Sequence, residues 1–168
     1  MNQQGISKIE VLIIALIIGV LGLMAVVAVS TARSRTRDAV RLSDVRQTQA
    51  ALELYFNDAN SYPVTTEALV LGGVSAGCLN EDGFTSSCGG SASIYLDTVP
   101  VTPTAGLDSL SACSGSKNAY CFQGSATQYQ IQFELEHDNP VLGLTAGLNC
   151  ATPTSLTDGA CILFSSAQ

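Results

Sequence analysis

Six cysteines are the residues of this chain whose type and spacing most clearly indicate chemistry. They are separated by 9, 24, 7, 28 and 10 residues and all follow residue 77: Cys78, Cys88, Cys113, Cys121, Cys150 and Cys161. No CxxC pair occurs and His137 is the only histidine, so the spacing of a zinc site is missing. An even number of cysteines without metal-ligand spacing predicts a disulfide framework in an oxidising compartment.

The spacing of the cysteines also bears on their pairing. Six cysteines allow many connectivities, which the sequence does not decide. The short gaps favour three local disulfides, each contributing about 2–3 kcal/mol to stability: Cys78–Cys88, Cys113–Cys121 and Cys150–Cys161. The alternative is six buried thiols in a cytosolic protein.

Other chemistry is poorly represented in the sequence. No nucleophile elbow or P-loop occurs, so we predict that the chain is not an enzyme. His137 stands between two acidic residues after a predicted strand, a pattern typical of an exposed turn. "NEDG" (80–83) and "EHDN" (136–139) offer oxygen ligands, but neither has EF-hand spacing. We therefore predict no cofactor and keep calcium only as an alternative.

Glu10 is a charged residue that stands directly before a long apolar segment. Residues 11–29, "VLIIALIIGVLGLMAVVAV", contain no charge and no hydroxyl group. As a helix they would rise about 28 Å, close to the thickness of a bilayer core. A cleaved secretory signal has a basic start and a shorter apolar stretch, so we predict a membrane-spanning helix. A carboxylate near the membrane core costs several kcal/mol unless it is paired, so Glu10 is expected to meet a positively charged partner. The alternative is that Glu10 only complements the dipole at the N-terminus of the helix.

The predicted helix continues beyond the apolar segment. Between Gly22 and Pro63 the chain contains no proline or glycine. An apolar stripe with alternating spacings of three and four residues predicts an amphipathic helix: Leu42, Val45, Gln49, Leu52, Phe56 and Ala59. "NDANSYP" (57–63) then ends the helix. We predict one helix over about 6–60, with a transmembrane or assembly half (6–29) and an amphipathic half (30–60).

Residues 61–168 are predicted to form a small head of loops and antiparallel strands. "YQIQFELE" (129–136) alternates strictly, which indicates a strand with one apolar and one wet face. "NAYCFQG" (118–124) and "ACILF" (160–164) are candidate neighbouring strands, and "TTEALVL" (65–71) is a candidate short helix. The predicted fold class is α+β, with the long helix packed on the apolar face of this sheet.

The distribution of charge separates the two parts of the chain. The net charge of −7 is the sum of +3 over residues 1–46 and −10 over residues 47–168. The acidic distal part argues against binding of nucleic acid. Five arginines, at positions 33, 35, 37, 41 and 46, are predicted to solvate the helix and to pair with acidic neighbours, with binding of phosphates or lipid headgroups as the alternative. Their place after the apolar segment favours a cytoplasmic head, whereas the cysteines favour the opposite side; we side with the cysteines.

With these parts placed, the N-terminus resembles that of type IV pilins and the related pseudopilins of type II secretion. "QGISKIE" aligns Gly5 with the last residue of the family's leader, Ile6 with the new N-terminus and Glu10 with the family's glutamate. The order of leader (1–5), long helix, "SYP" ending, "YLDTVP" loop and strand-rich head (61–168) is similar over nearly the whole chain.

The resemblance implies a structural protein. A prepilin peptidase would cut after Gly5, Ile6 would be N-methylated, and Glu10 would meet the amine of a neighbouring copy and set its register. The partners implied are further copies in a helical filament, the peptidase and the assembly machinery. The subunit would wait in the cytoplasmic membrane and then join a surface pilus or a periplasmic pseudopilus. Two alternatives stay open: a pseudopilin of a secretion or DNA-uptake machine, and an uncut membrane-anchored binding domain.

Overall fold

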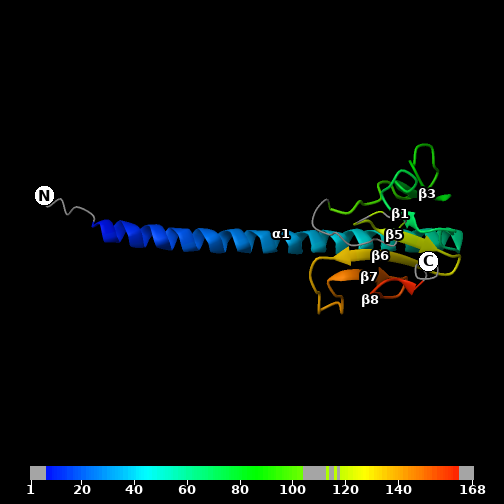
Figure 1. Ribbon diagram of the computed structural model, residues 1–168. Helices are drawn as coiled ribbons and strands as arrows, with labels where there is room; N and C mark the ends of the chain where they lie inside the picture. The colour runs from blue at the N-terminus through cyan, green and yellow to red at the C-terminus, as the bar shows by residue number, and fades with distance from the viewer. Residues whose placement is uncertain (1–6, 104–112, 114–115, 117, 163–168) are drawn as a thin grey trace.

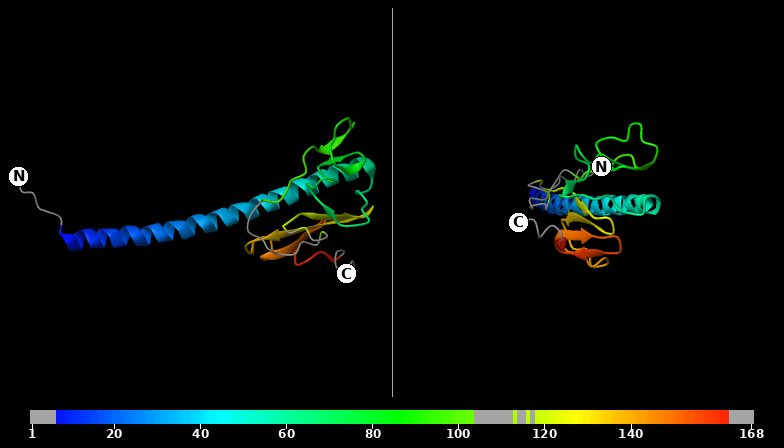
Figure 2. Two further views of the ribbon diagram at one scale, coloured as in Figure 1. Left: turned by 45° about the horizontal axis from the view of Figure 1, so that its top comes forward. Right: turned by 90° about the vertical axis from the view of Figure 1, so that its right-hand side faces the viewer.

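The computed structural model describes residues 7–103, 113, 116 and 118–162. One helix, α1 (Lys8–Ala59), runs the full length of the molecule, and a compact head surrounds its second half (Figure 1). Its 52 residues correspond to a rod about 78 Å long. Gly19 and Gly22 leave the helix unbroken, and the rod curves gently (Figure 2). The predicted single helix is confirmed for the described residues.

The sequence at the C-terminal end of α1 explains where it stops. Asn60 adopts the left-handed conformation (φ 56°, ψ 23°), and its backbone N–H donates to the carbonyl of Phe56 at 2.8 Å. Asparagine is one of the few residues that tolerate this conformation, so it serves as a helix C-cap. Pro63 follows and cannot continue the helix.

The predicted α+β fold class is confirmed, but the head contains two antiparallel sheets where one was predicted. The larger has the order β1-β5-β6-β7-β8 and the smaller the order β3-β2-β4. The strands are β1 (Leu69–Val70), β2 (Cys78–Asn80), β3 (Gly83–Thr85), β4 (Ile94–Leu96), β5 (Cys121–Gly124), β6 (Tyr129–Leu135), β7 (Gly147–Ala151) and β8 (Leu156–Asp158). Both sheets contact α1, through β6 and β4 respectively. The end of the helix lies between β3 on one side and β7 and β8 on the other (Figure 1).

The helix packs on the apolar face of β6, but its buried stripe differs from the predicted one. The buried helix residues are Ser34, Asp38, Arg41, Val45, Thr48, Ala51, Leu52 and Tyr55. This stripe begins two turns earlier than predicted, and its first three members are polar or charged. Of the predicted members, Leu42, Gln49 and Phe56 are half-buried and Ala59 is exposed. The prediction missed the first two turns because it looked only for apolar side chains.

The second face of β6 is a further correction. The apolar face is buried as predicted, but Gln132 and Glu134, expected in water, are only 2% and 6% exposed. Gln132 pairs in register with Cys121 of β5 and Cys150 of β7, so the three side chains share one face. Cys113–Cys121 and Cys150–Cys161 therefore flank Gln132, and its Oε1 accepts the N–H of Cys161 at 3.1 Å. Two disulfides thus lie beside Gln132 on the face that alternation alone predicted to be wet.

The three predicted disulfides are confirmed, whereas two predicted elements are wrong. Cys78–Cys88, Cys113–Cys121 and Cys150–Cys161 all form. Residues 65–71 contain bends and the short strand β1 in place of a helix, because this segment pairs with β5. Residues 160–162 form no strand, and 163–164 lie outside the described residues. The strands that follow β6 in the sheet are instead β7 and β8.

Tyrosine hydroxyls tie the head to carboxylates of α1. Tyr120 donates to Asp44 at 2.8 Å, Tyr62 to Glu53 at 2.9 Å and Tyr95 to Asp58 at 3.0 Å; these donors come from separate segments of the head. Tyr120 is 2% exposed. Burial raises the pKa of Asp44, and the hydrogen bond from Tyr120 opposes that rise.

Replacing Tyr120 by phenylalanine is expected to destabilise the head by about 1–2 kcal/mol, because Asp44 loses its donor in a half-buried place. Tyr95→Phe is the matched control, since its partner Asp58 is exposed and water replaces the lost donor. Urea unfolding of the full chain in detergent, followed by near-UV circular dichroism, measures both. Equal effects of the two variants would contradict the assigned role of Tyr120.

Candidate functional site: an assembly surface and its neck

The candidate assembly surface is the half of α1 that projects from the head. The large side chains of this segment are exposed, from Ile9 (67%) to Val29 (49%), and the apolar stretch has no part buried against the head (Figure 1). This is the one helix in the described chain that is long and apolar enough to cross a membrane. A surface of this kind requires lipid or the helices of other molecules as its surroundings.

Glu10 lies in the first turn of α1, after the N-cap Ser7. Its backbone N–H donates to the carbonyl of Ser7 at 3.0 Å. Its side chain is exposed and forms no ion pair with another described residue. The carboxylate therefore stands at the head of an apolar rod and is available to an outside partner. The predicted cleavage site, Gly5 and Ile6, lies outside the described residues.

A network of charged side chains marks the neck, which we define as residues 34–41 of α1 and residues 136–138 after β6. Arg41 is completely buried, and its Nη1 donates to Asp38 Oδ1 at 3.0 Å and to Glu136 Oε1 at 2.8 Å. Arg37 donates to both carboxylate oxygens of Glu136, with Nε at 2.6 Å from Oε1. Two arginines of the helix thus hold one carboxylate of the head.

Asp38 connects the helix to the end of β6. Its two carboxylate oxygens accept the backbone N–H groups of Glu136 (2.8 Å) and His137 (3.0 Å). The His137 ring also places Nδ1 3.2 Å from Asp38 Oδ2. Because these bonds engage backbone as well as side chains, they fix the direction in which the rod leaves the head. His137, predicted as an exposed turn, is half-buried in this network.

Ser34, His137 and Asp38 stand in the order of a catalytic triad. Ser34 Oγ is 3.5 Å from His137 Nε2, and the opposite ring nitrogen faces Asp38. However, Ser34 is buried within a continuous helix, and its hydroxyl donates to the Thr31 carbonyl at 2.9 Å. The backbone N–H groups around it are engaged in helix hydrogen bonds and are therefore not available to hold an oxyanion. The geometry supports a structural role in the neck.

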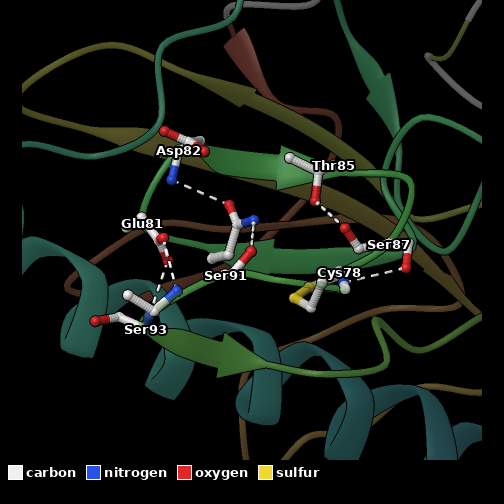
Figure 3. The surroundings of a disulfide bond; sticks show 11 residues. Cys78, Glu81, Asp82, Thr85, Ser87, Ser91 and Ser93 are labelled. Atoms are coloured by element: carbon white, nitrogen blue, oxygen red, sulfur yellow. Dashed lines mark hydrogen bonds between the residues drawn. A yellow bond between two sulfur atoms is a disulfide. The ribbon is translucent and has the colours of Figure 1, made fainter.

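In the two candidate calcium segments, Glu81, Glu136 and Asp138 use carboxylate oxygens within the protein. Glu81 accepts the backbone N–H groups of Ala92 and Ser93, both at 2.9 Å, beside the Cys78–Cys88 disulfide (Figure 3). These hydrogen bonds lower the pKa of Glu81. In the other segment Glu136 is held by the arginines, and Asp138 accepts the N–H of Ala146 at 2.8 Å. Among the described residues no group of three or more histidine, cysteine, aspartate or glutamate side chains is placed to hold a metal ion.

Sequence reasoning missed Arg41 and Asp38, although a signal for both was present. Arg41 lies four residues before the buried Val45, and Asp38 lies three residues before Arg41. They are therefore on the same helix face as the apolar stripe. The arginines were expected to solvate the helix and to pair with acidic neighbours; Arg37 and Arg41 do pair with a carboxylate, that of Glu136, but inside the neck. The complementary signal was Glu136, an acidic residue at the end of the alternating segment 129–136.

The neck predicts a specific dependence of stability on pH. The hydrogen bonds of Arg37, and then those of Arg41, lower the pKa of Glu136 from 4.5 to about 2 against the opposing effect of burial. Because the folded pKa is below the unfolded one, the contribution of Glu136 is fully present above pH 4.5 and is lost as the pH falls through 2. Glu136→Gln should thus be less stable than the wild type at pH 7, with a difference that shrinks between pH 4.5 and 2. Urea midpoints across this range test it, and a difference independent of pH would contradict it.

No protein-family model, curated protein or solved structure matches the chain at a significant level.

Proposed function

We propose that the chain is a structural subunit of a type IV pilus-like filament, processed after Gly5 by a prepilin peptidase and assembled through its N-terminal helix. The observation that carries this proposal is the exposed apolar half of α1, headed by Glu10 and attached to a compact head. A helix of this kind serves first as a membrane anchor and then as the packing element of a bundle.

The proposed mechanism begins with removal of residues 1–5, which creates an amine on Ile6. A carboxylate entering an apolar bundle requires a partner because an unpaired charge there costs several kcal/mol. The amine of a neighbouring copy supplies that partner to Glu10. Subunits then add in one register, since a shifted neighbour would leave both charges unpaired. N-methylation of Ile6 keeps the positive charge.

The compartment is part of the proposal. The subunit first crosses the cytoplasmic membrane once, with its head outside the cytoplasm, and then joins a surface filament or a periplasmic pseudopilus. Three disulfides in the head support this orientation because such bonds persist in oxidising compartments. The arginines after the apolar segment favour the opposite orientation, with the head in the cytoplasm. Their effect is weaker than five charges would give, because Arg37 and Arg41 are paired with Glu136.

Mass spectrometry of the mature N-terminus tests the proposal. We expect a chain that begins with methylated Ile6, and we expect Gly5→Leu to leave residues 1–5 attached and to abolish filaments. An intact Met1 in a normal cell would overturn processing. Electron microscopy of sheared surface material then separates an abundant pilus from a short pseudopilus of a secretion or DNA-uptake machine.

A second candidate is an uncut, membrane-anchored binding domain. The observation that favours it is a groove of about 450 Å³ at the neck, lined by Arg35, Asp38, Ala39, Leu42, Leu135, His137, Asp138, Asn139 and Pro140. This candidate predicts an unprocessed chain and a monomeric state in detergent. The same mass measurement therefore decides between the two.

A further inference from the structure

The tertiary structure divides the arginines that follow the apolar segment into two groups. Arg37 and Arg41 form ion pairs with Glu136 inside the neck. Arg33 and Arg35 are exposed and form no ion pair with another described residue. Two positive charges without a described ion-pair partner thus remain on the helix, Arg33 just before the neck and Arg35 on the exposed side of the neck.

If the apolar segment spans the hydrocarbon core, the positions of Arg33 and Arg35 along the helix place them at the level of the lipid headgroups. With the helical rise, Arg33 and Arg35 lie about 6 and 9 Å beyond Val29, the last apolar residue of the exposed segment. The headgroup layer extends about 5–8 Å beyond the hydrocarbon core on each side of a bilayer. The long arginine side chains reach back along the helix over the remaining distance. Arg37, about 12 Å beyond Val29, lies outside this layer and pairs within the protein.

The directions of the two side chains distinguish between kinds of partner. Residues two apart on an α-helix are separated by about 200° around its axis. Arg33 and Arg35 therefore leave opposite sides of the rod. A bilayer surface surrounds the helix and meets both, whereas the head of a single neighbouring copy meets one side. The geometry favours a lipid surface.

We propose that Arg33 and Arg35 form a collar that binds the phosphate groups of anionic phospholipids and sets the depth of α1 in the membrane. Beyond Arg46 the described residues include no arginine or lysine, while exposed carboxylates are spread over the head: Asp58, Glu67, Glu81, Asp82, Asp97, Asp138 and Asp158. An anionic surface attracts the collar and repels this head. The head is thereby held clear of the surface. This inference does not depend on filament assembly.

Native mass spectrometry of the full chain in detergent micelles, with phosphatidylglycerol or phosphatidylcholine added, tests the collar. We expect the wild type to retain phosphatidylglycerol in preference to phosphatidylcholine. The double variant Arg33→Gln/Arg35→Gln should lose this preference about 25-fold, or about fivefold for each arginine. Arg46→Gln is the matched control for charge because it is exposed but lies about 26 Å beyond Val29; it should retain the preference.

Several results would overturn the collar. One is equal retention of the two lipids by the wild type, and another is an unchanged preference in the double variant. Displacement of phosphatidylglycerol by millimolar inorganic phosphate would assign the charges to a soluble anion. A double variant that keeps its lipid but loses self-association would assign them to a second copy. Near-UV circular dichroism of the variants should be unchanged, since both side chains are exposed and neither forms an ion pair with a described residue of the head.

Discussion

Replacing Glu10 by glutamine is expected to lower the yield of filaments about a hundredfold while the chain still enters the membrane. Truncating one partner of a desolvated charge pair costs about 2–5 kcal/mol, because the other charge stays buried without compensation. In the proposed filament that other charge is the amine on Ile6 of a neighbouring copy. Each added subunit suffers the loss, so the subunit concentration needed for growth rises by the same factor.

The measurement is the amount of sheared surface filament, by immunoblot and electron microscopy, relative to the subunit in the membrane fraction. Lys8→Gln is the matched control because Lys8 is an exposed charged residue in the same first turn of α1. It should change the yield at most a few-fold. A normal filament yield from Glu10→Gln with normal insertion would contradict the proposed pairing and leave Glu10 as a complement of the helix dipole.

Replacing Arg41 by methionine is expected to destabilise the head by about 3–5 kcal/mol, the usual cost of breaking a buried ion pair from one side. Arg41 is completely buried and joins Asp38 to Glu136. Methionine approximates the length of the side chain, so the loss reports the charge and hydrogen bonds more than the volume. Arg37 would still hold Glu136, which keeps the effect within this range.

Near-UV circular dichroism during urea unfolding of the full chain in detergent measures this loss. The signal reports the head because all five tyrosines lie between residues 55 and 129. Arg46→Met, an exposed arginine five residues further along α1, should change stability by under about 0.5 kcal/mol. A similarly small effect of Arg41→Met would show that the neck is held by the contacts of Asp38 and by the Arg37–Glu136 pair.

Local patterns predicted much of the fold because their physical causes are local. The long helix follows from the absence of proline and glycine between Gly22 and Pro63, and it ends where Asn60 adopts the left-handed conformation. The short gaps favoured the three pairings that the structure contains, because each disulfide closes a loop of only 8 to 11 residues in sequence separation. The apolar face of β6 followed from its alternation.

The failures came where distant segments meet. Alternation in β6 predicted Gln132 in water, yet the register of β5 and β7 places Cys121 and Cys150 beside it. The segment 65–71 has a helical composition, but pairing with β5 makes part of it a strand. In each case a contact made by residues far away in sequence overrode a local preference.

The sequence by itself determined the rod, its apolar first half, the position of Glu10 and the disulfide framework, because each depends on residues within a few turns of one another. Only the tertiary structure decided what the charges near the neck do. Five arginines are alike in sequence, but the end of β6 arrives beside two of them and brings Glu136 into hydrogen-bonding distance. Arg33 lies before that meeting point, and Arg35 stays exposed at its edge. Whether a charged side chain is paired or exposed depends on its neighbours in space, and these are not evident from the sequence.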